Sequence, residues 1–150
     1  MSYFKKAKTR HEPPTEDNFE DLGLKIMCRR KKEGASNVIF EHRFRSFFGT
    51  SPHVCVQLWD LLNPFEEMAP DNPGLQVEHL LWALLFLKLY AEESVHCGLV
   101  GGVDKKTFRK WSWLFIEYIS FLETDLVSFC YSFKSFDHEI LNNIIFLTSL

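Results

Sequence analysis

The segment that most constrains the fold of this chain is residues 76–90, which predicts a helix that is apolar around almost its whole circumference. Apolar residues recur in it at the three- and four-residue spacing of one helical face: Val77, Leu80, Leu81, Leu84 and Leu85. Large apolar side chains cover much of the remaining surface: Trp82, Phe86, Leu87 and Leu89. Such a helix must be covered by other elements on most sides. The segment therefore predicts the centre of a helical bundle.

Two further helices are expected before this one. The first spans residues 36–48, with Ser36 or Asn37 as its cap and Gly49 as its end, and it carries phenylalanines along one side. The second starts at Ser51-Pro52, where a hydroxyl cap precedes a proline at the first helical position. No strand-like alternation of comparable length precedes residue 125. The sequence thus predicts an all-α bundle of about five helices.

Composition divides the chain into three parts. Residues 1–35 are rich in Lys, Glu, Asp and Pro and are expected to form a flexible charged leader. Residues 36–127 form the predicted helical domain, and residues 128–150 form a tail that could be a further helix or a strand. The basic run at residues 25–32 is interpreted either as a nuclear-import or phosphate-contacting patch or as a solvated charge run.

Charge and motif content exclude several classes of function. The net charge is −3, so binding to nucleic acid would have to come from a local basic patch. The four cysteines are far apart, which argues against a zinc site and favours free thiols in an intracellular compartment. The longest strongly apolar run, residues 80–87, is far shorter than the ~20 residues of a membrane span. We expect no metal, no cofactor, no small-molecule substrate, no membrane association and no catalytic residue.

Residues 93–111 carry the features of a helix-turn-helix, the motif that places its second helix in the DNA major groove. Gly98 is interpreted as the small residue that allows close helix crossing. Gly102 is suited to the positive φ of the turn, and Val103 is expected to fill the space between the helices. Asp104 is a good N-cap for the second helix.

The predicted second helix has one apolar face and one basic face. At about 100° per residue, the apolar face holds Phe108, Trp111, Phe115, Tyr118, Ile119 and Leu122. The predicted DNA-binding residues are Lys105, Lys106, Arg109 and Lys110, with support from Thr107 and Trp113. A recognition helix needs this division, because its back must be anchored while long cationic side chains reach the DNA. The alternative is a bundle helix whose outer face is lysine-rich.

Three segments resemble the N-terminal region of Harbinger-type DDE transposases, and the resemblance covers residues 38–127. They are FRSFFGTSPHVCVQLWDLL (44–62), HLLWALLFLKLYAEE (79–93) and GGVDKKTFRKWSWLFIEYI (101–119). The resemblance implies a helix-turn-helix-like region that binds DNA at transposon ends around residues 105–110. It also implies a following catalytic domain with three metal-binding carboxylates, which does not lie within these 150 residues.

The function expected from the sequence is binding of double-stranded DNA in the nucleus, as a truncated transposase-derived protein without enzyme activity. Two alternatives remain open. The acidic stretch of residues 51–100 and the many aromatic residues could form a helical protein-interaction module or a surface for self-association. The chain could also be a non-functional transposon relic.

Overall fold

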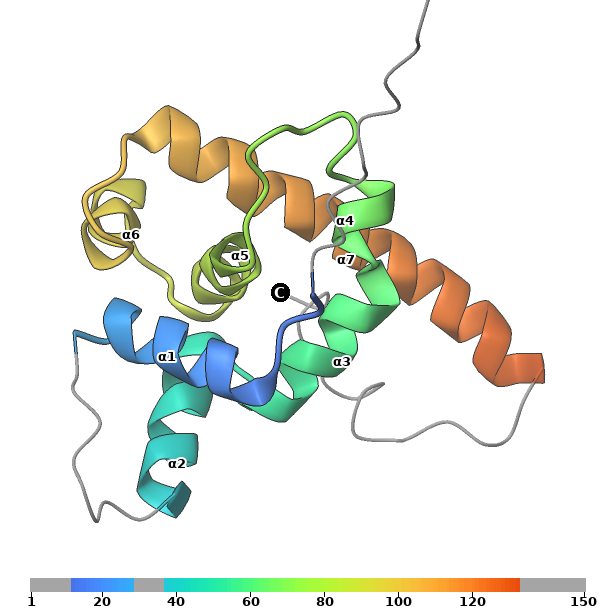
Figure 1. Ribbon diagram of the computed structural model, residues 1–150, viewed down its shortest axis with the longest axis horizontal. Helices are drawn as coiled ribbons and strands as arrows, with labels where there is room; N and C mark the ends of the chain where they lie inside the picture. The colour runs from blue at the N-terminus through green and yellow to red at the C-terminus, as the bar shows by residue number, and fades with distance from the viewer. Residues whose placement is uncertain (1–11, 29–36, 133–150) are drawn as a thin grey trace, which may run out of the picture.

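A computed structural model describes residues 12–28 and 37–132, and every regular element in these residues is an α-helix (Figure 1). The helices are α1 (Glu16–Ile26), α2 (Asn37–Phe48), α3 (Pro52–Leu62), α4 (Pro64–Glu67), α5 (Glu78–Lys88), α6 (Glu93–Leu99) and α7 (Lys105–Ser132). The prediction of an all-α fold is confirmed. The described residues contain more helices than the five expected, and the additions are α1 and the short α4.

Helix α5 lies at the centre of the bundle, as its apolar circumference predicts. In Figure 1 it is seen nearly end-on, with α1, α6 and α7 around it, and it also packs against α2. Its leucines at positions 80, 81, 84 and 85 have no solvent exposure. A helix without a polar face gains the full benefit of apolar burial only in such a position.

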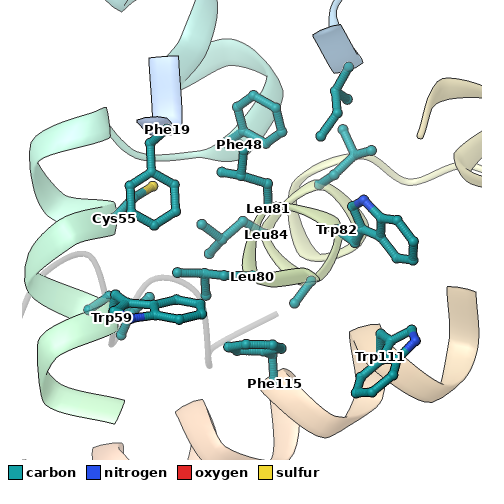
Figure 2. Packing of buried hydrophobic residues seen from close by; sticks show 14 of the residues in the cluster. Phe19, Phe48, Cys55, Trp59, Leu80, Leu81, Trp82, Leu84, Trp111 and Phe115 are labelled. Carbon is teal, nitrogen blue, oxygen red and sulfur yellow. The ribbon is translucent and has the colours of Figure 1, made fainter. Parts of the chain in front are cut away.

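The core joins α1 and α7, the first and last helices of the described residues, to α5. Figure 2 shows Phe19 of α1, Trp59 of α3 and Phe115 of α7 approaching the α5 leucines from different sides. The Trp59 and Phe115 rings stack with their centroids 5.9 Å apart, and Phe19 meets Trp59 edge-on at 6.4 Å. These large rings bury much of the apolar area that stabilises the fold.

The prediction of a flexible leader is wrong for residues 16–26, which form α1 and pack into the core. Thr15 begins this helix with a capping box, because its side chain accepts from the Asn18 amide while the Asn18 side chain accepts from the Thr15 amide. Phe19 is fully buried, and Leu24 and Ile26 are buried beside it. The many charged residues of this segment are compatible with a helix because they occupy its solvent side.

A glycine permits the close approach of α1 to α2. A Cβ atom built on Gly23 would lie 2.4 Å from Cε2 and 2.8 Å from Cδ2 of Phe44. Phe44 is fully buried and sits between Phe40 and Phe48, with ring centroids 5.9 and 4.6 Å away. Position 23 therefore has no room for a side chain unless the aromatic cluster moves.

Parts of the predicted leader and tail, together with the cap candidate Ser36, lie outside the described residues. The residues outside are 1–11, 29–36 and 133–150, which include most of the basic run. Of the predicted tail, residues 128–132 belong to the last turns of α7. The helix predicted from Asp104 onwards is thus longer than expected, at 28 residues.

Candidate nucleic-acid interface

The turn between α6 and α7 is built by two glycines. Gly101 and Gly102 have φ values of 102° and 78°, a region that other residues rarely adopt. The Gly102 amide donates to the Cys97 carbonyl at 2.8 Å, and the Gly101 amide donates to the Gly98 carbonyl at 3.4 Å. This pair of bonds satisfies the last carbonyls of α6 in a Schellman arrangement. The expectation of a positive φ at Gly102 is confirmed.

Asp104 caps α7, as the sequence predicts. Its Oδ1 accepts from the Thr107 amide at 3.0 Å, and its Oδ2 accepts from the Thr107 hydroxyl. These hydrogen bonds hold the pKa of the Asp104 carboxyl below its ordinary value. The Thr107 hydroxyl is therefore engaged with the cap, which makes Thr107 a part of the helix start.

Two histidines anchor the inner face of α7 through ring contacts. His79 of α5 stacks on Trp111 with centroids 4.3 Å apart, and His96 of α6 stacks on Phe108 at 5.6 Å. Phe108 also stacks on Trp82 at 6.0 Å. All five side chains are buried. The first two turns of α7 therefore rest on a rigid aromatic layer contributed by α5 and α6.

Burial lowers the pKa of both histidines below its ordinary value. Burial and the nearby Lys110 lower the pKa of His79 to about 4, and its Nδ1 accepts from the Gln76 amide at 3.1 Å. Burial also lowers the pKa of His96, and this effect outweighs that of the Leu89 and Ala91 backbone, which raises the pKa. The sequence analysis found no role for these histidines, because their aromatic partners come from another helix.

The four predicted basic residues all lie exposed on α7, with Lys105 and Lys106 in its first turn. Neither lysine forms an ion pair within 4 Å with a residue of the described ranges. Lys110 is also exposed, but its Nζ lies 4.3 Å from the centroid of the Trp111 ring. This cation–π geometry orients the Lys110 ammonium while leaving it accessible.

Of the four predicted basic residues, Arg109 is the one that forms an ion pair with a described residue. Its Nε donates to Oε1 of Glu93 at 2.9 Å and its Nη2 donates to Oε2 at 2.6 Å. The Arg109 hydrogen bond lowers the pKa of the Glu93 carboxyl, and the same contact raises the pKa of Arg109. Sequence reasoning missed Glu93, because the two residues are sixteen positions apart and lie on different helices.

Trp113 lies on the outer side of α7 and is 52% exposed. Its ring centroid is 5.9 Å from that of Phe86 of α5, so one edge of the indole packs on the bundle. On a helix, position 113 shares a face with positions 106, 109 and 110. The structure thus brings an exposed aromatic ring next to the basic side chains.

The role expected for Gly98 is wrong. Gly98 is exposed, and a Cβ atom built on it would meet no heavy atom within 4 Å, so it does not enable close helix crossing. Of the α6 residues, His96 contacts α7 by stacking on Phe108, and Cys97 is buried in the core. Val103 is partly buried and packs against the core.

A groove between α3 and the segment leading into α1 is a second candidate site. It has a volume of about 510 Å³ and is lined by Pro13, Pro14, Thr15, Glu16, Asp17, Val56 and Asp60. Small-molecule sites are lined mainly by apolar and aromatic side chains, whereas four of these seven residues are polar or charged and none is aromatic. Glu16 is moreover engaged with His53 Nδ1 at 2.7 Å.

Other kinds of site find no support in the ranges that the structure covers. Among residues 12–28 and 37–132, no three His, Cys, Asp or Glu side chains are grouped to hold a metal ion. Within the same ranges, no helix combines the length and the apolar character that crossing a bilayer requires.

Comparison with known proteins yields no relative: no family model, no curated protein and no solved structure matches this chain.

Proposed function

We propose that this chain binds double-stranded DNA through the α6–turn–α7 unit, acting as a helix-turn-helix. The observation that carries the proposal is the division of the first turns of α7. Lys105, Lys106 and Arg109 are exposed on one side, while Phe108 and Trp111 on the other are buried against α5 and α6. A rigidly backed helix with exposed cations is what phosphate contact and groove insertion require.

The first turn of α7 adds to the attraction for DNA. The N-terminus of a helix carries a partial positive charge, and Lys105 and Lys106 lie within that turn. In a net-acidic chain, such a concentration of positive charge defines where a polyanion would approach.

A double charge reversal in this turn tests the proposal. Lys105→Glu/Lys106→Glu places two anions where phosphates would lie, so we expect weaker binding to duplex DNA. The salt dependence of binding should flatten by about one log–log unit for each lost phosphate contact. Folding should be retained, because glutamates in the first turn of a helix interact favourably with its dipole.

The control carries the same change in net charge at a different place. Arg43→Glu/Arg45→Glu alters two exposed cations of α2, outside both the basic run and α7, and should bind DNA almost as the native protein does. Melting curves of all three proteins verify the fold. If the native protein binds no duplex at low salt, or if both double variants bind equally well, the proposal is wrong.

We further propose that the protein derives from a transposase and acts in the nucleus. Its support is the resemblance of residues 44–62, 79–93 and 101–119 to the Harbinger-type N-terminal region. The genomic sequence downstream of the Leu150 codon provides the test. A frame encoding an acidic catalytic domain would support this origin, and its absence over several hundred codons would contradict it.

A second function, protein interaction, is favoured by exposed aromatic side chains on α7. Phe121 is 59% exposed and Trp113 is 52% exposed, and they lie on the same side of the helix, about 80° apart. Exposed aromatic residues of this kind are typical of interfaces. Sedimentation of the native protein and of Trp113→Ser/Phe121→Ser over a range of concentrations tests self-association. A monomer at all concentrations in both cases would contradict that form of the second function.

A further inference from the structure

The contact between Arg109 and Glu93 has a definite orientation. Both hydrogen bonds lie on the edge of the guanidinium formed by Nε and Nη2, and each uses a different oxygen of the Glu93 carboxylate. The Arg109 side chain is 59% exposed, whereas that of Glu93 is 26% exposed. Glu93 thus approaches the arginine from the α6 side, and much of the guanidinium surface faces solvent.

The unused edge of this guanidinium has the geometry of a base-reading group. An arginine carries five N–H donors in a fixed plane, and Glu93 occupies two of them. The other three include both donors of Nη1 and one of Nη2, so a complete two-nitrogen edge remains available. Guanine presents two acceptors, O6 and N7, in the major groove, and a bidentate arginine is the commonest specific contact to it.

The ion pair changes what Arg109 can contribute to DNA binding. The adjacent carboxylate offsets much of its charge, so Arg109 adds less to sequence-independent attraction than Lys105 and Lys106 do. The bidentate contact also restricts the rotamers of a long side chain before any DNA arrives. Less conformational entropy is then lost on binding. The contact with Glu93 therefore reduces the electrostatic attraction of Arg109 for DNA but orients its guanidinium before DNA binds.

We propose that Arg109 reads a guanine in the major groove and that Glu93 is the positioning residue that fixes its guanidinium plane. This inference rests on the proposed binding of duplex DNA and names the base that the site selects. In it, α6 takes part in specificity through Glu93 without touching the DNA base.

Selection from a pool of random-sequence duplexes tests the proposal with the full chain. The native protein should enrich guanine at one position of its site. Against a duplex changed at that position, affinity should fall by about 5- to 150-fold, the range expected of a good bidentate pair. Arg109→Lys should lose this preference, since an ammonium lacks the planar fork.

Glu93→Gln and Glu92→Gln form the decisive matched pair. Each removes one negative charge at the start of α6, and Glu92 contacts Ser94 at 3.3 Å rather than Arg109. Both variants should bind unselected duplex as tightly as the native protein or more tightly. Only Glu93→Gln should lose most of the preference for guanine, and a merely structural role for Glu93 would leave that preference intact.

Each result separates the two proposals. Duplex binding without guanine enrichment would overturn the role of Arg109 and leave DNA binding in place. An unchanged guanine preference in Glu93→Gln would overturn the positioning role of Glu93. Absence of duplex binding by the native protein would overturn both the inference and the function on which it rests.

Discussion

The replacement of Gly23 by alanine tests the docking of α1 onto α2, which is the largest departure from the sequence expectation. The new Cβ would lie 2.4 and 2.8 Å from two ring atoms of Phe44 and 3.3 Å from Cε2 of Phe48. Ordinary contact between carbon atoms begins at about 3.5 Å, so the fully buried Phe44 ring or the whole of α1 must shift.

The expected magnitude follows from two opposed effects. Overpacking of a well-packed core costs typically about 1–3 kcal/mol of the free energy of unfolding. Alanine in place of a helical glycine returns about 0.5–1 kcal/mol. The 2.4 Å approach places the overpacking at the upper end of its range, about 2–3 kcal/mol. Gly23→Ala should therefore lower stability by about 1–2.5 kcal/mol, or about 2–10 °C in Tm for a chain of this length.

Gly98→Ala is the matched control, because it makes the same change in a helix with open space around it. A Cβ at position 98 meets no heavy atom within 4 Å, so only the helical preference of alanine remains. We expect Tm to rise by about 1–4 °C. Thermal and urea unfolding of the native protein and both variants, followed by circular dichroism, gives the comparison.

The reasoning would be refuted if Gly23→Ala were as stable as the native protein. In that case Gly23 would not lie against the Phe44 ring, and the packing of α1 on α3 and α5 would be its main contact with the core. A clear loss of stability in Gly98→Ala would instead support the prediction from the sequence that Gly98 allows α6 to cross another helix closely.

Three further predictions concern the core, a helix cap and a buried histidine. Phe108→Ala should lower the free energy of unfolding by about 3–5 kcal/mol in urea titrations, because it empties a fully packed site beneath α7. Ser51→Ala should lower it by about 1 kcal/mol, since the Ser51 hydroxyl caps α3 by accepting from the Val54 amide at 3.3 Å. The low pKa of His79, about 4, lies below the 6.5 of the unfolded state, so its contribution to stability is complete above pH 6.5 and is lost as the pH falls towards 4. Urea titrations at pH 7 and pH 5 should show that His79→Asn reduces the loss of stability between these pH values by about 2 kcal/mol.

The failure to predict α1 has a specific physical cause. Phe19, Leu22 and Ile26 recur in this helix at the three- and four-residue spacing of one helical face, and Thr15 and Asn18 form its cap. The average composition of residues 1–35 is strongly charged, and this average hides an amphipathic helix of three turns. Composition describes a whole segment, whereas burial depends only on the face that meets the core.

The candidate site could be predicted in part, because several of its features follow from the spacing of residues along one helix. The basic outer face of α7, its aromatic inner face and the Asp104 cap are all features of one continuous segment, and the structure places them as expected. The prediction that Gly98 allows a close helix crossing is wrong, because a small residue in a helix does not indicate whether another helix approaches it.

The sequence by itself determined the all-helical fold, the central place of α5 and the buried side of α7. Each of these follows from the spacing of apolar residues along a single helix, which the local sequence contains. Tertiary structure alone decided which helices meet. It set Gly23 against Phe44, stacked His79 on Trp111, and brought Glu93 to Arg109 on another helix. These contacts depend on how helices cross in space, and the spacing of residues along one helix does not contain that information.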